Sequence, residues 1–165
     1  VFPYMEKIGI LWLTNHINPA QEHLVTNIIR QKLIVGIENT RCSARIDKTV
    51  LLFLPDGEFH ELGLLFMNFL LKSRGVCAVY LGCSVPIDDV EFVARAKKPD
   101  YIFTHLTSVG HKFNFEKFIS TINKKFPTVP VVISGQLTLT YEKKIHPPVI
   151  LIKSLAGVLD FVGGL

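Results

Sequence analysis

The chain has 165 residues, of which 48% are apolar, and its mean hydropathy is +0.35. This length and composition suit one substantial core and exclude a mainly disordered protein. The 18 basic and 14 acidic residues give a net charge of +4 without a dense basic run, which argues against a nucleic-acid-binding surface on this chain.

The first residues carry the pattern of an amphipathic helix. Apolar side chains recur at helical spacing over residues 4–13, among them Trp12, and a polar stretch follows at 14–16. On periodicity alone, Trp12 fits the core of a helical bundle. The pattern opens directly at Val1, so we expect further sequence upstream.

A second helix is expected to begin at Pro19. Asn18 precedes this proline and Gln21 follows three residues after Asn18, which is the arrangement of a capping box with proline at the first helical position. We expect the helix to end near Val35 or Gly36. The residues expected to be buried are Leu24, Ile28 and part of the row from Ile29 to Leu33. Because two helices cannot enclose a core alone, residues 1–46 are predicted to form a cap that belongs to a helical bundle.

From Thr49 onward, apolar runs alternate with amphipathic stretches. The runs are typical of strands buried on both faces: Thr49–Leu54, Val76–Leu81, Tyr101–Leu106, Val129–Ser134 and Val149–Ile152. The amphipathic stretches cover 60–74, 88–97, 113–125, 137–144 and the residues from Ser154. This alternation predicts an α/β fold over residues 47–165, with a Rossmann-like (flavodoxin-like) sheet of five parallel strands. The polar residues 41–48 are expected to link it to the cap.

Ligands of such a sheet bind at the carboxyl ends of the strands, and the loop after the first strand contains His60 there. A carboxylate, Glu58, stands two residues before it and could fix its tautomer, while Gly63 would let a bulky group approach the backbone. The alternative for a lone loop histidine is a solvated or capping residue.

Several other sites are disfavoured by the same sequence. No GxGxxG or Walker loop follows the first strand. His60-Glu61 does not extend to a zinc-protease HExxH motif, because Leu64 stands at the second histidine position. The six histidines show no close ligand pairing, which argues against a structural zinc site. A Ser-His-Asp triad stays open but has no GxSxG elbow.

Three segments resemble the base-off, His-on cobalamin domains. Glu58-x-His60-x-x-Gly63 is similar to their DxHxxG motif, Thr104-x-Leu106 lies at the place of their SxL, and Ser134-Gly135 at the place of their GG. The resemblance implies that His60 is the lower axial ligand of cobalt, that Glu58 orients it, and that the other segments line a slot for the dimethylbenzimidazole tail. The cofactor-binding residues predicted on this basis are Glu58, His60, Gly63, Ser84, Val85, Thr104, Leu106, Ser134 and Gly135. Since Glu, Thr and Ser replace the commoner Asp, Ser and Gly, the slot is expected to be tighter or differently bonded.

A second signature resembles the cap of light-sensing, cobalamin-binding regulators fused to MerR-type DNA-binding domains. Trp12 is followed after nine residues by Glu22-His23, similar to the W-x9-EH pattern of that cap. The resemblance implies that Trp12, Glu22 and His23 surround the adenosyl group on the upper face of the cofactor. An indole offers a broad apolar wall, and the Glu-His pair supplies hydrogen bonds for a ribose. The alternative for the pair is a first-turn acid and a surface histidine.

Together these resemblances imply a sensor domain with no catalytic turnover. It would hold adenosylcobalamin, respond to light by changing its homo-oligomeric assembly, and reach DNA only through an upstream domain. One alternative is a corrinoid methyl carrier for a methyltransferase; another is a cofactor-free interaction domain with a decayed site. The odd cysteine count, Cys42, Cys77 and Cys83, and the lack of a membrane-spanning or signal segment indicate a cytoplasmic protein.

Overall fold

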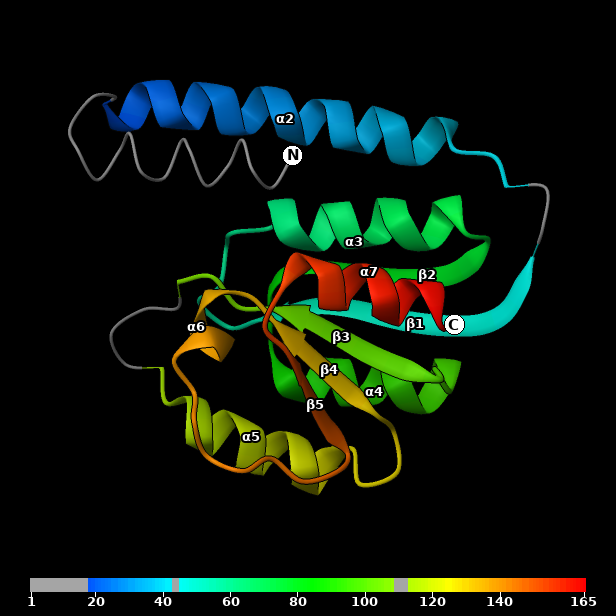
Figure 1. The fold of residues 1–165 in the computed structure, drawn as a ribbon, viewed down its shortest axis with the longest axis vertical. Helices are drawn as coiled ribbons and strands as arrows, with labels where there is room; N and C mark the ends of the chain where they lie inside the picture. The colour runs from blue at the N-terminus through cyan, green and yellow to red at the C-terminus, as the bar shows by residue number, and fades with distance from the viewer. Residues whose placement is uncertain (1–17, 43–44, 109–112) are drawn as a thin grey trace.

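The computed structural model describes residues 18–42, 45–108 and 113–165 (Figure 1). The helix predicted over residues 4–13, with Trp12, lies outside these ranges. The elements are α2 (Pro19–Asn39), β1 (Ile46–Pro55), α3 (Leu62–Ser73), β2 (Val76–Val85), α4 (Ile87–Lys97), β3 (Tyr101–His105), α5 (Phe115–Lys125), β4 (Val131–Ser134), α6 (Gln136–Leu139), β5 (Val149–Ile152) and α7 (Leu155–Gly163).

The five strands form one parallel sheet in the order β2-β1-β3-β4-β5. Val50 of β1, for example, pairs with Ala78 on one side and with Tyr101 on the other. Each strand is connected to the next by a crossover that contains a helix, as parallel pairing requires. The predicted Rossmann-like, flavodoxin-like fold is confirmed, and its strand order reverses between β1 and β3.

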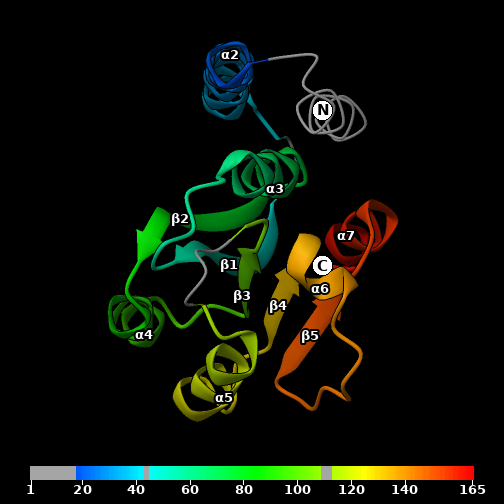
Figure 2. The same ribbon diagram turned by 90° about the vertical axis from the view of Figure 1, so that its left-hand side faces the viewer.

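Helices cover both faces of the sheet, as Figure 2 shows end-on. Helices α3 and α7 lie on one face, and α4 and α5 lie on the other. Two buried apolar clusters fill these layers. Leu64, Met67, Leu71, Val158 and Val162 pack on the α3 side, and Val90, Ala94, Phe118, Ile119 and Ile122 pack on the other. Helix α2 is a third layer that packs mainly on α3, and Tyr80 of β2 joins the apolar cluster between the two helices.

Helix α2 begins as predicted and ends later. Asn18 caps it through a complete capping box with Gln21, but the helix continues beyond Gly36 to Asn39 because Ile37 is buried against α3. The prediction that Leu24 and Ile28 are buried is wrong, since they are 63% and 49% exposed. At about 100° per residue, both lie on the side of the helix roughly opposite Leu33, which makes the contact.

Three further boundaries and burial patterns differ from expectation. Strand β1 begins inside the predicted linker 41–48, because the Asp100 carboxylate accepts hydrogen bonds from Lys48 Nζ at 2.9 Å and from the Thr49 backbone at 2.8 Å. The stretch 137–144 forms only the short helix α6. Strands β2 and β5 are edge strands and are not buried on both faces; Ile150, for example, is 43% exposed.

The carboxyl ends of the strands lie on the same side as the amino ends of α2 and α3 (Figure 1). The loop after β1 lies on the side of the N-terminal half of α2, where Arg30 of α2 bonds to Glu61. Among the helices of the described ranges, none combines the length and apolarity needed to cross a lipid bilayer.

Candidate functional site

Glu58 joins the two loops that flank the point where the strand order reverses. Its side chain is fully buried in the loop after β1. One oxygen, Oε1, accepts a hydrogen bond from the His60 backbone at 2.9 Å. The other, Oε2, accepts from the backbone N–H groups of Thr107 at 2.8 Å and Ser108 at 3.0 Å, in the loop after β3. This reversal point is where doubly wound sheets form their ligand crevice.

The same carboxylate orients His60. Glu58 Oε1 lies 2.6 Å from Nδ1 of the His60 ring, whose side chain is 57% exposed. No group of the described residues bonds Nε2 on the other side of the ring. A ring that donates its Nδ1 proton to a carboxylate carries its lone pair on Nε2 and can offer it to a metal.

The two groups shift each other's pKa in opposite directions. Burial alone would raise the pKa of Glu58, but hydrogen bonds from the His60 side chain and from the three backbone N–H groups outweigh it and lower the pKa to about 2. The hydrogen bond to Glu58 raises the pKa of His60 against the effect of burial, and the charges of Glu58 and Glu22 add to the rise.

The negative charge of Glu22 acts on His60 and so couples helix α2 electrostatically to the loop after β1. Glu22 lies in the first turn of α2, and its Oε1 accepts a hydrogen bond from Thr26 Oγ1 at 2.8 Å. His23 points away, because its side chain is 74% exposed and its Nδ1 lies 3.7 Å from Glu22 Oε2. The structure thus brings Glu22 near His60 and leaves His23 in solvent, while Trp12 lies outside the described residues.

An ion-pair network next to His60 ties the cap to the domain. Arg30 of α2 donates from Nε to Oε1 of Glu61, and Tyr80 of β2 donates from its hydroxyl to Oε2 at 3.2 Å. Burial and the neighbouring Glu61 raise the pKa of the Tyr80 phenol. The sequence reasoning missed this network, because no local pattern relates charges 31 positions apart.

Ser84 at the end of β2 supports the His60 loop from the other side. Its backbone N–H donates to the Glu58 carbonyl at 3.1 Å, and its hydroxyl accepts from the Gly57 backbone at 3.3 Å. Ser84 adopts a left-handed conformation with φ of 53°. Val85 pairs with Pro55 and packs in the core on the α4 side. Both residues shape the loop within the protein.

The segments predicted to line the tail slot come together at the ends of β3 and β4. Leu106 donates its backbone N–H to the Ser134 carbonyl at 2.8 Å. Gly135 has a φ of 102°, and a Cβ there would lie 2.4 Å from the Leu106 carbonyl oxygen, so only glycine fits. Thr104 is fully buried, and within the described part of the chain its hydroxyl has no hydrogen-bond partner. Such an unsatisfied buried hydroxyl fits a polar group of a bound ligand.

His105, between Thr104 and Leu106, was not predicted as a site residue. Its ring packs on the first turn of α3, where a Cβ on Gly63 would lie 2.4 Å from its Cδ2 atom. Gly63 therefore admits a bulky group, as expected, but that group is a side chain of the protein. Strand alternation could have signalled this, since position 105 shares a sheet face with Phe103, beneath α3.

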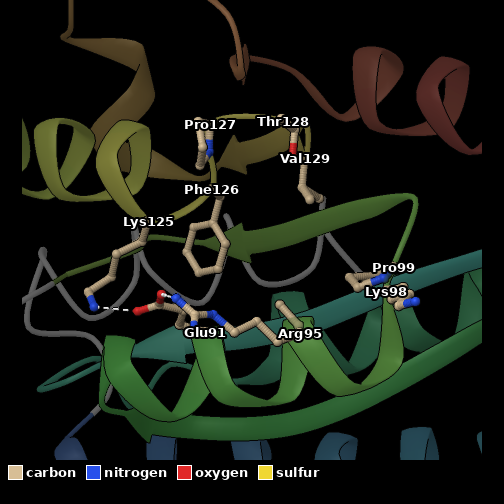
Figure 3. A pocket seen from close by; sticks show the side chains of 10 residues that line it. Glu91, Arg95, Lys98, Pro99, Lys125, Phe126, Pro127, Thr128 and Val129 are labelled. Carbon is tan, nitrogen blue, oxygen red and sulfur yellow. Dashed lines mark hydrogen bonds and ion pairs between the residues drawn. The ribbon is translucent and has the colours of Figure 1, made fainter.

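A hollow of about 330 Å³ lies between α4 and α5, at the end of the sheet opposite to His60 (Figure 3). Its wall includes Glu91, whose Oε2 accepts a hydrogen bond from Lys125 Nζ at 2.5 Å. Arg95 pairs with the same carboxylate and Asp88 pairs with Lys125, so these four charges have partners of opposite sign within the protein. The hollow adjoins the amino ends of β3 and β4, away from the crevice of the fold. Among the described residues, no three His, Cys, Asp or Glu side chains group to hold a metal ion.

Comparison with curated proteins identifies two repressors. The chain is 28% identical over 141 residues to the HTH-type transcriptional repressor CarH of Myxococcus xanthus, covering 85% of this chain and 46% of the repressor. It is 24% identical over 135 residues to the HTH-type transcriptional repressor CarA of the same organism, covering 82% and 45%. The chain is homologous to these two repressors. It spans a little under half of their length, and no protein-family model matches it.

The solved structures that resemble the chain share its fold. The monomethylamine corrinoid protein of Methanosarcina barkeri superposes with a TM-score of 0.67 at 14% identity, covering 98% of this chain and 78% of that one. At this identity the likeness concerns the fold alone, and it agrees with the Rossmann-like architecture found here.

Proposed function

We propose that the chain is the cobalamin-binding sensor domain of a transcriptional regulator, with His60 as the lower axial ligand of cobalt. The observation that carries this proposal is the Glu58–His60 pair at the reversal point of the sheet. It presents an exposed imidazole in a fixed orientation with Nε2 directed to an incoming metal. When bound, the corrinoid would supply a cobalt centre with an exchangeable upper ligand.

Two further observations support this function. The proteins found by sequence comparison are transcriptional repressors, and the solved structure with the same fold is a corrinoid protein. We also assign Thr104, whose buried hydroxyl has no hydrogen-bond partner among the described residues, to the lower site. We propose that Gly63, Ser84, Val85, Leu106, Ser134 and Gly135 complete the lower site around His60.

The upper ligand in this proposal is adenosyl. Glu22 lies close enough to His60 for its charge to act on that ring, as expected of a group that faces the cofactor from the cap. Trp12 and His23 would complete the upper contacts, with His23 turning inward from its exposed position. Loss of the adenosyl group in light would remove these contacts. The equilibrium between two assemblies would then shift by the difference in affinity of the cofactor for each.

The regulator as a whole would act without turnover. We propose that this chain forms homo-oligomers in the cytoplasm and affects DNA only through an upstream DNA-binding domain. A methyl-carrier function has the shared fold in its favour but no sequence relative among the proteins compared above, so we rank it second. A cofactor-free domain with a decayed site is the third alternative.

Reconstitution tests these alternatives. The purified chain is incubated with adenosylcobalamin in the dark, separated from unbound cofactor, and examined by absorbance and size-exclusion chromatography before and after illumination. We expect bound corrinoid and a light-dependent change in spectrum and assembly. A parallel sample is incubated with methylcobalamin, and binding of methylcobalamin with no light-dependent change of assembly would favour the methyl carrier. A colourless chain that binds neither corrinoid would overturn the proposed function.

Two histidine variants, one at the site and one as a control, make the test specific to His60. His60→Ala is expected to weaken corrinoid binding by about 10- to 100-fold, as loss of a metal-site group commonly does. His146→Ala, at an exposed histidine before β5, is expected to bind like the wild type.

A further inference from the structure

The three segments of the predicted lower site meet at one side chain, that of His105. It directly follows Thr104, it covers Gly63, and it contacts Ser134. With a Cβ added to Gly63, the ring atoms Cδ2 and Nε2 would lie only 2.4 and 2.6 Å away, so the ring packs flush against the backbone of α3. No space for a second aromatic ring remains between His105 and this turn.

Ser134 holds this ring in place. The Ser134 hydroxyl lies 2.8 Å from Nδ1 of His105, and the serine is 2% exposed. At the same position the resembling motif has a glycine, which offers no hydroxyl. The replacement of Gly by Ser134 and the presence of His105 are thus parts of one arrangement.

The buried ring is also electrically neutral. Burial lowers the pKa of His105 to about 4, although the charge of Glu58 opposes this shift. A neutral imidazole that is hydrogen-bonded to a buried hydroxyl is a stable filling for an interior site and has no charge that draws it toward water.

We infer that His105 is a specificity-determining residue that excludes the nucleotide base from the lower slot, so that the chain selects its corrinoid by the ring and cobalt and not by the tail. This inference rests on the proposed function. His60 is outside the filled region and more than half exposed, so it can bind cobalt once the base of a cobalamin has left the lower face, and that base would then stay in solvent. A corrinoid without a nucleotide then loses no contact that this chain makes.

The test compares cobalamin with cobinamide, which has the same corrin ring and cobalt but lacks the nucleotide and its base. Dissociation constants of the aquo forms are measured by absorbance titration for the wild type and for His105→Ala. We expect the wild type to bind cobinamide at least as tightly as cobalamin, because the base of cobalamin has to leave the cobalt before His60 binds and finds no slot in the protein. His105→Ala opens the slot, and burial of the aromatic base there is expected to shift the ratio of the two dissociation constants toward cobalamin by about tenfold or more.

Two controls accompany the titration. His146→Ala is expected to keep the wild-type ratio, and circular dichroism with thermal unfolding checks that His105→Ala is folded. The wild-type ratio is a test by itself even if that variant does not fold. A wild type that prefers cobalamin by more than about tenfold overturns the inference, as does a folded His105→Ala with an unchanged ratio. If neither corrinoid binds either protein, the proposed function itself is wrong.

Discussion

Glu58 and His60 are joined twice, because one carboxylate oxygen lies 2.6 Å from the ring nitrogen Nδ1 and 2.9 Å from the backbone nitrogen of His60. The second oxygen is bonded to the backbone of the loop after β3. A single buried carboxylate thereby orients the His60 imidazole, for which we propose the role of cobalt ligand, and fixes the loop that carries it.

The first prediction is that Glu58→Gln impairs both binding and folding. The amide NH₂ group of the glutamine is a donor and would face the N–H groups that now donate to Glu58. We therefore expect a loss of about 1–3 kcal/mol in unfolding free energy. Corrinoid affinity is expected to fall about 10- to 100-fold. Urea unfolding and absorbance titration measure the two effects. The control is Asp56→Asn in the same loop, whose exposed carboxylate reaches only the Ser84 hydroxyl, at 3.4 Å. Wild-type values for Glu58→Gln would contradict the role of this residue.

A second prediction concerns the stability of the folded chain at low pH. His105 has a pKa of about 4 in the folded chain against an ordinary 6.5, so its contribution to stability is present above pH 6.5 and is lost as the pH falls toward 4. Glu58 has a pKa of about 2 against an ordinary 4.5, so its contribution is lost between pH 4.5 and 2. Unfolding free energy measured from pH 6.5 downward should therefore decrease in two successive windows, below the range in which the raised pKa of His60 acts in the opposite direction.

Variants separate the two windows. His105→Asn is expected to flatten the decrease between pH 6.5 and 4, whereas His146→Asn at an exposed site should leave it unchanged. An identical pH profile for His105→Asn and the wild type would show that His105 does not titrate as its burial requires.

A third prediction concerns the attachment of the cap. Arg30→Ala removes the donor to Glu61 and is expected to speed amide hydrogen exchange in α2, with a loss of stability below about 1 kcal/mol because the pair is partly exposed. Arg95→Ala is the matched control, since Arg95 makes an ion pair within α4. Equal exchange in α2 for both variants would exclude a role of Arg30 in docking.

A fourth prediction compares two leucines of the same helix. Leu33 is 8% exposed and packs on α3, whereas Leu24 is 63% exposed. Leu33→Ala should cost about 2 kcal/mol of unfolding free energy, while Leu24→Ala should cost less than about 0.5 kcal/mol. Thermal or urea unfolding measures both. An effect at Leu24 as large as that at Leu33 would contradict the assignment of the Leu33 side of α2 as the packed side.

The sequence predicted the elements whose signals are local. The capping box of Asn18 and Gln21 marked the start of α2, because this cap is formed by neighbours along the chain. The last amphipathic stretch was expected from Ser154, and α7 begins directly after it. The apolar runs predicted all five strands, and the loop after the first strand contained the Glu58–His60 pair.

What the sequence did not predict depends on contacts between distant residues. The apolar residues of α2 alone did not show which side of this helix packs on α3, so Leu24 was wrongly expected to be buried. The start of β1 depends on Asp100, about fifty positions away. His105 stood at a variable position of a short motif, and only the fold shows that it fills the space above Gly63.

The central claim is that the His60 imidazole binds cobalt. The most direct measurement is electron paramagnetic resonance of the cobalt(II) corrinoid in protein made with ¹⁵N-labelled histidine. A histidine ligand predicts that the nitrogen splitting changes from a triplet to a doublet on labelling, and that His60→Ala abolishes the doublet. A triplet that persists in the labelled protein, or no nitrogen splitting at all, would contradict the claim.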